Sequence, residues 1–449
     1  MRCMHTLAQL RAGQLAGATR LDLSAGLTEF PREIFELADT LEVLNLSGNA
    51  LSDLPDDLPR LHRLKVVFAS GNRFTTLPDV LGQCPTLSMV GFKTNQIDQV
   101  PANSLPMSLR WLILTDNRIE RLPDTLGQCT ALEKLALAGN RLRALPDTMA
   151  ACRNLALARL SANAFESFPD WLFTLPRLNW LALAGNPALP EPATATAPGS
   201  SVLSDIDWDA LSLHEVLGQG ASGVIHRADW RHGGRVQPVA VKLFKGEVTS
   251  DGWPHSEMAA CLGAGRHPGL IPVLGRVLGH PAGTAGLVME LIDPAFAVLA
   301  APPSLESCSR DVYAPDTEFS LVEALQIASQ TASALAHLHA RGVMHGDFYG
   351  HNLLWRRGHS VLLGDHGAAT MFDPGDGVRA QAFQRLEVRA WACLLEELLQ
   401  HLAPHDRALP SVAPLLALQQ ACAQPDTRLR PDWRAVMSTL AGLVQVQDK

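Results

Sequence analysis

Residues 41–54, which are followed by Pro55, contain the pattern that decides the fold of the first part of the chain: LEVLNLSGNALSDL. Leucine occupies its first, fourth, sixth and eleventh positions, and Asn49 occupies the ninth. The starts of successive copies lie 23 residues apart, with one interval of 22. Repeats of this length predict a solenoid in which each copy buries its apolar side against the next. The six further copies begin at Leu64, Leu87, Leu109, Leu132, Leu155 and Leu178.

The residue types within a copy predict how it packs. The four apolar positions point inward, and the asparagine satisfies backbone groups that the turn leaves unpaired. A Leu-Pro pair such as Leu54-Pro55 opens the opposite side of the copy, where proline can begin a helical turn. A first copy at 21–31 lacks the asparagine. Residues 1–17 before it predict a cap over the open end of the core.

Three of the eight cysteines, Cys84, Cys129 and Cys152, fall at one position of the repeat. Leucine occupies this position in other copies, so buried thiols are favoured over disulfides. Reduced thiols indicate a reducing compartment, and we expect a cytoplasmic protein. The N-terminal residues lack the apolar core of a secretory signal, and no run of about 18 apolar residues predicts a membrane span. The net charge of −8 gives no reason to expect nucleic acid as a partner.

The pattern L-x-x-L-x-L-x-x-N-x-L is the signature of leucine-rich repeats, and these copies resemble the intracellular Ras-group type. The resemblance implies an α/β solenoid over residues 18–189, with about eight repeats of which the first and last are atypical. The third and fifth positions of a copy then face the concave side, and the third position holds Trp111 and, further on, Trp180. We expect an exposed apolar cluster that binds a protein partner or the chain's own second domain. The alternative is that these side chains lie flat across neighbouring strands. The cluster comprises Phe68, Met89, Trp111 and Ile113.

Residues 190–205 are rich in Pro, Ala, Ser and Thr and lack periodicity, which predicts a linker. A second domain then covers residues 206–449. Its first motif is a glycine turn, Gly218-x-Gly220-x-x-Gly223, followed directly by Val224. Glycines in such a turn let backbone amides approach phosphate groups. The motif is weak by itself, because glycine-rich hairpin turns are common.

Six further features follow in order. Lys242 ends the strand sequence Val-Ala-Val-Lys, and Glu257 begins a helical stretch after it. Residues 287–291 read as a buried strand, and residues 321–341 form an amphipathic helical pattern. The sequence HGDFYGHN follows this pattern, with an aspartate five residues before an asparagine. A predicted hairpin then leads to Asp365 in LGDHG.

Together these motifs resemble the protein-kinase superfamily over residues 210–445, and with the repeats they resemble leucine-rich-repeat protein kinases of bacterial type. The resemblance implies a bilobal α+β domain and an ATP-dependent serine/threonine-type protein kinase. Lys242 would hold the phosphates and pair with Glu257, and Asp347 would take the proton of the acceptor hydroxyl. Asn352 and Asp365 would hold Mg²⁺, or Mn²⁺. The residues implied to contact ATP are Gly218, Gly220, Gly223, Val224, Ala240, Lys242, Glu257, Met289, Glu290 and Leu291.

The resemblance fails around Asp347. Gly346 stands where many protein kinases have an arginine that reads a phosphate on the activation segment. Tyr349 replaces a lysine, and His351 stands where tyrosine-type kinases place an arginine. The segment between Asp365 and a helix expected over residues 387–399 is short, and its one hydroxyl residue before position 386 is Thr370. We therefore expect no control by phosphorylation there.

Two other functions stay open. His-Gly-Asp and a short activation segment also occur in small-molecule phosphotransferases that resemble aminoglycoside kinases. The glycine turn and the Val-Ala-Val-Lys strand argue against that class. A scaffold with a degenerate kinase fold is the other alternative. Against it stands the retained set of residues that would touch ATP and metal: Lys242, Glu257, Asp347, Asn352 and Asp365.

Overall fold

The computed structural model describes residues 5–189, 204–220, 222–246 and 248–447. The chain divides into two compact units. Unit 1 comprises Met1–Leu178 and Asn186–Ala188, and unit 2 comprises Asn179–Gly185 and Leu189–Lys449. Most of the predicted linker lies outside the described residues, because these omit 190–203.

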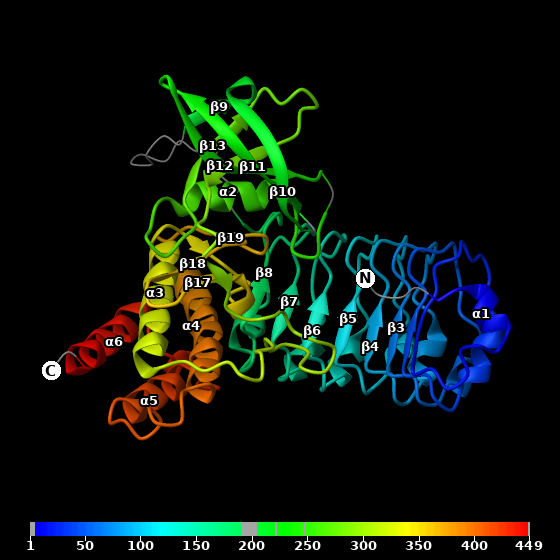
Figure 1. The fold of residues 1–449 in the computed structure, drawn as a ribbon. Helices are drawn as coiled ribbons and strands as arrows, with labels where there is room; N and C mark the ends of the chain where they lie inside the picture. Colours follow the sequence, from blue (N-terminus) through cyan, green and yellow to red (C-terminus); the bar gives the residue numbers. More distant parts are fainter. Residues whose placement is uncertain (1–4, 190–203, 221, 247, 448–449) are drawn as a thin grey trace. The chain divides into compact units, whose positions relative to one another are not determined.

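Unit 1 is a stack of short parallel strands with the spacing of the sequence repeat. Each strand pairs with the next in chain order, so that equivalent repeat positions lie side by side. Val66, for example, lies opposite Met89, which lies opposite Trp111. Figure 1 shows these strands side by side. The strands are β1 (Arg20–Asp22), β2 (Val43–Asn45), β3 (Val66–Phe68), β4 (Met89–Gly91), β5 (Trp111–Ile113), β6 (Lys134–Ala136) and β7 (Leu157–Arg159).

The repeat leucines and asparagines have the predicted roles. Leu41, Leu44, Leu46 and Leu51 are all fully buried. The amide nitrogen of Asn72 donates to the carbonyls of Leu46 and Ala69, and its oxygen accepts from the backbone N–H of Leu51 at 2.9 Å. This pattern recurs from repeat to repeat, so each asparagine connects its own turn to the preceding copy. The same arrangement is formed by Asn49, Asn95, Asn117, Asn140 and Asn163.

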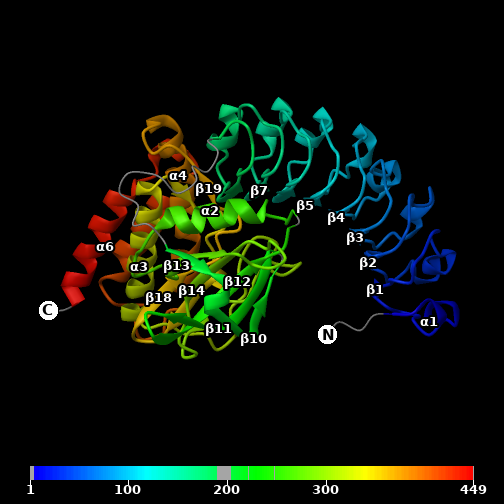
Figure 2. The ribbon, with the colours of Figure 1, turned by 90° about the horizontal axis from the view of Figure 1, so that it is seen from above.

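The other side of each repeat is a short 3₁₀ helix. Proline is the residue before most of these helices, for example Pro78, Pro123 and Pro146, as the Leu-Pro pairs predict. Figure 2 shows the strands on the inner side of the curved array and these helices on its outer side. The helices are η1 (Arg32–Leu37), η2 (Leu58–Arg60), η3 (Asp79–Gln83), η4 (Ala102–Ser104), η5 (Asp124–Gln128), η6 (Asp147–Ala151) and η7 (Asp170–Thr174).

The start of the array and its cysteines also agree with the sequence pattern. Helix α1 (Leu7–Arg11) begins with a capping box between Thr6 and Gln9 and buries Leu10. Cys84, Cys129 and Cys152 are buried free thiols. Burial raises the pKa of each of these thiols to about 11.

Met89 differs from its predicted exposure. Its side chain is only 4% exposed, because it lies between Val66 and Trp111 on the neighbouring strands. Phe68, Trp111 and Ile113 are each partly exposed. The apolar cluster therefore consists of three partly exposed side chains and the buried Met89.

Unit 2 contains a six-stranded sheet, in which β10, β11, β12, β14 and β13 are antiparallel and β9 joins β13 in parallel. Figure 1 shows this sheet and α2 apart from the helices α3 to α6, so the unit is bilobal. The sheet elements are β9 (Ser204–Asp207), β10 (Leu211–Gln219), β11 (Gly223–His232), β12 (Arg235–Phe244), α2 (Pro254–Ala264), β13 (Val273–Leu278) and β14 (Gly286–Glu290), with η8 (Trp208–Ala210) after β9.

The helical part of unit 2 is built around α3, whose predicted boundaries agree with the structure. Ser320 and Glu323 form a capping box at its start. The β17/β18 hairpin also lies where predicted, ahead of Asp365. Helix α4 begins at Gly377, well before the predicted start, because the side chain of Asp376 caps it by accepting from the N–H of Arg379. The elements are β15 (Ala297–Val298), α3 (Leu321–Ala340), β16 (Val343–Met344), η9 (Gly350–Asn352), β17 (Leu353–Arg356), β18 (Ser360–Leu363), β19 (Thr370–Met371), α4 (Gly377–Gln400), α5 (Val412–Cys422), η10 (Thr427–Leu429) and α6 (Trp433–Gln447).

One repeat strand belongs to unit 2. Strand β8 (Trp180–Ala182) continues the repeat pattern, but Asn179–Gly185 pack with the second unit. All three residues of β8 are buried. The second unit therefore includes the strand of the last in-phase repeat.

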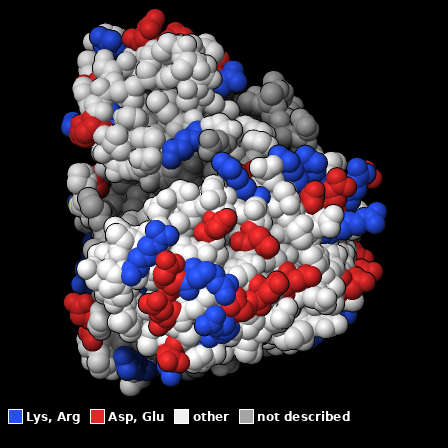
Figure 3. Space-filling model, turned by 90° about the vertical axis from the view of Figure 1, so that its right-hand side faces the viewer, with Lys and Arg blue, Asp and Glu red and all other residues white. Residues whose placement is uncertain are grey.

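Two properties of the surface bear on partners. On the face seen in Figure 3, Lys and Arg side chains are interspersed with Asp and Glu. This mixture gives that face no strong field of one sign to attract a polyanion. Among the residues described, the model contains no helix with the length and apolar character needed to span a bilayer.

Candidate active site

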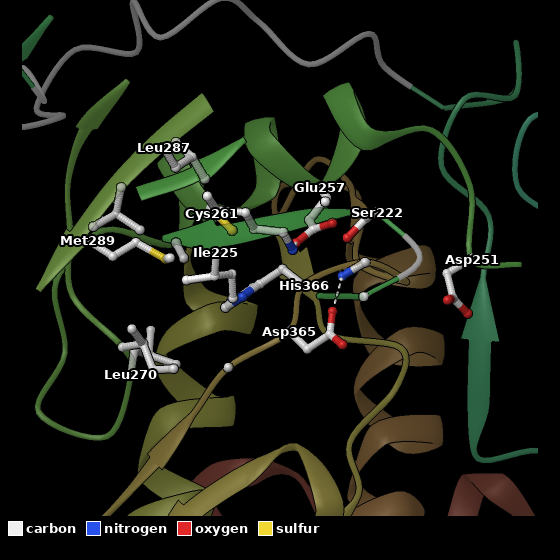
Figure 4. A pocket seen from close by; sticks show the side chains of 18 of the residues that line it. Ser222, Ile225, Asp251, Glu257, Cys261, Leu270, Leu287, Met289, Asp365 and His366 are labelled. Atoms are coloured by element: carbon white, nitrogen blue, oxygen red, sulfur yellow. Dashed lines mark hydrogen bonds and ion pairs between the residues drawn. The ribbon is translucent and has the colours of Figure 1, made fainter. Parts of the chain in front are cut away.

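A cavity in unit 2 lies between the sheet and the start of the helical part. Gly220 and Gly223 of the glycine turn, Lys242 of β12 and Asp365 after β18 all line it. Figure 4 shows the aliphatic side chains of Leu270, Leu287 and Met289 towards one side and the oxygens of Ser222, Glu257 and Asp365 towards the other. One side of the cavity is thus suited to an apolar ring and the other to charged groups.

Lys242 and Glu257 form an ion pair inside this cavity. Strand β12 carries the lysine and α2 carries the glutamate, in the first turn of the helix. Burial by itself lowers the pKa of Lys242, but the carboxylates of Glu257 and Asp365 outweigh burial and raise it overall. Lys242 is therefore an ammonium group held at the wall of the cavity, where it can pair with an anion.

Asp365 also lines the cavity, in a strained conformation. Its φ of +50° falls in the left-handed region, which costs a non-glycine residue about 1–3 kcal/mol. Its Oδ1 accepts from the N–H of Gly367 at 3.2 Å, and the residue is exposed to solvent. His366, next to it, is buried beside His345. Burial lowers the pKa of His366 to about 3, so this imidazole is neutral near pH 7.

Asp347 and Asn352 hold each other on the loop between β16 and β17. The amide of Asn352 donates to the backbone carbonyl of Asp347 at 2.8 Å and to its carboxylate at 3.0 Å. The backbone carbonyl of Asn352 in turn accepts from Gly364 at 3.1 Å. Asn352 therefore connects the carboxylate of Asp347 to the segment that carries Asp365.

Glu387 supports this loop from α4. Its carboxylate accepts from the backbone N–H groups of His345 and Gly346, and it lies 2.7 Å from the ring nitrogen of His339. Burial alone would raise the pKa of Glu387, but these hydrogen bonds lower it overall. The sequence predicted a supporting helix here without identifying this contact.

A second basic group lies on the loop. The Nδ1 of His351 lies 2.7 Å from Oδ1 of Asp311, and the backbone N–H of His351 donates to Oδ2 of the same carboxylate at 3.0 Å. Burial opposes protonation of this ring, but hydrogen bonding to Asp311 and the nearby charges of Asp347 and Asp365 raise its pKa overall. The raised pKa favours the protonated form of His351, beside the carboxylates of Asp311 and Asp347.

Six predicted site residues meet in the described lining of the cavity: Gly220, Gly223, Lys242, Glu257, Met289 and Asp365. Val224 is not among them, and Ile225 lines the cavity instead. Because side chains alternate along a strand, Val224 points to the other face of β11. The glycine motif should therefore have been extended by one residue, to Ile225.

The other predicted residues lie near the cavity but outside its described lining. Ala240 lies opposite Met289 in the pairing of β12 with β14, and Glu290 and Leu291 follow Met289. Gly218 lies in β10, before the turn. Asp347 and Asn352 lie on their own loop, attached to Gly364 as described above.

Several residues that line the cavity lie outside the sequence motifs. Cys261 follows Glu257 by one helical turn on α2, which is a signal that could have identified it. Thr249 and Asp251 come from the loop before α2, and Ile271 comes from the loop before β13. Loop residues of this kind reach a cavity only through the tertiary fold.

The cavity fits a nucleotide with its metal ion. Glu257 Oε2 and His366 Nε2 are buried polar atoms without a hydrogen-bond partner among the described residues. Both belong to side chains of the cavity lining, where a polar ligand could satisfy them. Asn352 and Asp365 present an amide and a carboxylate, which are oxygen ligands of the kind that Mg²⁺ prefers.

Comparisons with known proteins identify families for two parts of the chain. Residues 211–402 match a family model described as protein tyrosine and serine/threonine kinase. Residues 40–61 match a model described as Leucine Rich Repeat. The chain therefore contains leucine-rich repeats and a protein kinase domain.

Two relatives are named serine/threonine-protein kinases. A-Raf of Homo sapiens is 27% identical over 168 residues, which are 36% of this chain and 24% of that protein. The RAF proto-oncogene serine/threonine-protein kinase of Xenopus laevis is 26% identical over 177 residues, which are 38% of this chain and 24% of that protein. The matches thus span about a quarter of the length of these relatives.

Proposed function

We propose that this protein is an ATP- and Mg²⁺-dependent protein kinase that phosphorylates serine or threonine hydroxyls. The observation that carries the proposal is the ion pair of Lys242 with Glu257 facing Asp365 in one cavity. A lysine held at this place can position the phosphates of ATP. The names of the relatives favour a protein acceptor over a small molecule.

Each residue would have a separate task. Gly220 and Gly223 would let backbone amides approach the phosphates, and Lys242 would bind phosphate oxygens as an ammonium group. The carboxylate of Asp347, oriented by Asn352, would accept the proton from the acceptor hydroxyl. Asn352 and Asp365 would hold Mg²⁺, which neutralises charge that develops on the transferred phosphoryl group.

Labelled ATP tests this proposal. The purified full-length protein is incubated with γ-labelled ATP and Mg²⁺, alone, with casein, and with a mixture of small alcohols and aminoglycosides. We expect label on serine or threonine of a protein, as shown by phosphoamino-acid analysis. Label on the small molecules alone would support a small-molecule phosphotransferase. Nucleotide binding without any transfer would support a scaffold.

For unit 1 we propose that the partly exposed side chains of Phe68, Trp111 and Ile113 bind a protein. Gly91 leaves the space that the Phe68 ring occupies, because a Cβ there would lie 2.6 Å from that ring. The ammonium of Lys134 lies 4.7 Å from the centre of the Trp111 ring, which adds a charge beside the apolar cluster. Large aromatic side chains of this kind dominate many binding interfaces.

A paired substitution tests this surface. Phe68→Ser with Trp111→Ser should weaken the capture of a partner from a lysate, or change the kinase activity of the full-length chain if the partner is its own kinase domain. Trp171→Ser, on a helix of the outer side, is the matched control. If the paired variant matches wild type in both assays, the surface has no binding role.

A further inference from the structure

The kinase-like unit contains a strand that its catalytic motifs do not require. Strand β8 carries Trp180 at the third position of its repeat, the position that Trp111 occupies three repeats earlier. Trp111 is partly exposed, whereas Trp180 is only 1% exposed. The difference arises inside unit 2, where Trp180 packs against the loop that carries Asp347.

Trp180 makes two contacts with that loop. Its indole N–H donates to the backbone carbonyl of Phe348 at 2.8 Å. Its ring stacks on Tyr349, with the ring centres 4.1 Å apart and an angle of 10° between the planes. The centre of the Tyr349 ring also lies 4.9 Å from that of the His351 ring. An aromatic column therefore runs from the repeat strand along the catalytic loop.

The backbone of β8, and that of Leu183 directly after it, contacts the loop on the other side of Asp347 and the segment after Asp365. Gly346 has a φ of +72°, and a Cβ there would lie 2.5 Å from the carbonyl oxygen of Leu181. The backbone N–H of Leu183 donates to the hydroxyl of Thr370 at 3.0 Å. Residues 180–183 thus touch the loop on both sides of Asp347, and Leu183 touches the short segment between β18 and α4.

The contacts of β8 coincide with two of the departures from the kinase pattern. Gly346 stands in place of an arginine, and only a residue without a side chain leaves room for the strand at that point. Tyr349 stands in place of a lysine and supplies the ring on which Trp180 stacks. Both substitutions therefore fit a loop that is held by a protein strand rather than by a phosphate on the activation segment.

We propose that Trp180 is a positioning residue for phosphotransfer, which holds the loop so that Asp347 is directed at the acceptor hydroxyl. This inference rests on the proposed kinase function. Trp180 acts through Phe348 and Tyr349 and touches no reacting atom. A loop displaced by a fraction of an ångström should lose turnover and keep its nucleotide, because the nucleotide is held by residues of the cavity.

The experiment compares Trp180→Leu and Trp180→Phe in the full-length protein with wild type. Trp171→Leu is the matched control, since its indole donates to Asp147 within unit 1. In Trp180→Leu we expect kcat to fall about 10- to 100-fold, while the KM for ATP and the affinity for Mg²⁺–ADP stay within about two-fold. Trp180→Phe keeps the stacked ring and should lose less.

A double-mutant cycle tests the stacking partner. Tyr349→Leu should lower kcat by a similar factor. The kcat of the variant with both substitutions should be no lower than that of the less active single variant, because both substitutions remove the same contact. Hydrogen exchange of peptides from residues 345–352 should be faster in Trp180→Leu and unchanged in Trp171→Leu. If Trp180→Leu fails to fold, Trp180→Phe and Tyr349→Leu decide the question.

Three outcomes would overturn the inference. Folded Trp180→Leu could show wild-type kcat and wild-type hydrogen exchange, or its kcat could fall together with an equal fall in ADP affinity. The third outcome is a fall in the kcat of Trp171→Leu as large as that in Trp180→Leu. The exchange measurement separates this failure from that of the proposed function. If wild type transfers no phosphate but residues 345–352 exchange faster in Trp180→Leu, the positioning contact stands and the kinase proposal alone fails. If wild type transfers no phosphate and residues 345–352 exchange no faster in Trp180→Leu, both the kinase proposal and the positioning contact fail.

Discussion

The two ends of the proposed catalytic cleft differ in how they are built. At the nucleotide end, Lys242, Glu257 and Asp365 meet in one cavity, and each residue is of the type that the kinase resemblance implies. At the acceptor end, Gly346 and Tyr349 depart from that resemblance, and both contact a strand that continues the repeat pattern. In the proposed reaction, ATP and its metal ion bind at the nucleotide end, and the acceptor binds at the other end. The part of the cleft that faces the acceptor can therefore be rebuilt without loss of ATP binding.

The largest effect is expected at the nucleotide end. Lys242→Met removes the ammonium group that pairs with Glu257, and we expect no detectable transfer of phosphate from ATP. The fold should persist, because methionine fills the same space and the lysine lies at the wall of a cavity. Incorporation of label and circular dichroism measure the two properties. Lys65→Met, which removes an exposed ion pair with Glu42, is the control and should keep wild-type activity.

Asp347→Asn tests the acceptor end and should separate it from the nucleotide end. The amide cannot take a proton, so kcat should fall by roughly 10²- to 10⁴-fold. The affinity for Mg²⁺–ATP should be nearly unchanged, as measured by calorimetry, because Asp347 lies outside the described lining of the cavity. Asp316→Asn, at an exposed position, is the control. If Asp347→Asn abolished ATP binding and Asp365→Asn did not, the roles of the two aspartates would be exchanged.

How far the sequence predicted these two ends depends on how local the relevant contacts are. The repeat leucines are buried, and the repeat asparagines bond to backbone groups of their own turn and of the preceding copy, so a periodic sequence is enough to predict both roles. Lys242 and Asp347 belong to motifs whose spacing defines their place. Ile225 was missed because the glycine motif was ended one residue early, an error that strand alternation could have corrected.

The rest of the acceptor end could not be predicted. Trp111 and Trp180 occupy the same repeat position, and nothing in the repeat itself distinguishes the exposed ring from the buried one. The contact of Trp180 with Tyr349 joins residues that are far apart in sequence. The support from Glu387 likewise depends on how α4 packs under the loop. Such contacts follow from tertiary packing, which no local pattern specifies.

Gly346→Ala measures how tightly the acceptor end is packed. The added Cβ would lie 2.5 Å from the carbonyl oxygen of Leu181 and 2.7 Å from that of Ala368, at a φ of +72°. Strain and overpacking together should lower the free energy of unfolding by about 2–4 kcal/mol, as measured with urea. Gly442→Ala is the control, since a Cβ meets nothing within 4 Å there and a helical alanine should be neutral or stabilising. Equal stability of Gly346→Ala and wild type would contradict the packing of β8 against the loop.

The smallest effect is expected from phosphatase treatment, which would act on any phosphate at Thr370. This residue is the one hydroxyl group between Asp365 and Arg385, and it is the residue that an activation-segment phosphate would require. In the structure its side chain is fully buried, and its hydroxyl accepts from the backbone N–H of Leu183. A phosphate on that oxygen could not be accommodated without displacing β8, and Gly346 offers no arginine to neutralise it. Phosphatase treatment should therefore leave kcat within about two-fold of that of untreated enzyme, with intact mass used to verify that phosphate is absent.

Thr370→Glu should lower activity and stability together, because it buries a charge against a strand. Thr370→Ser, which keeps the hydroxyl, is its control. A loss of activity after phosphatase treatment, restored by Thr370→Glu, would show that this loop uses a phosphate after all and that β8 does not replace it.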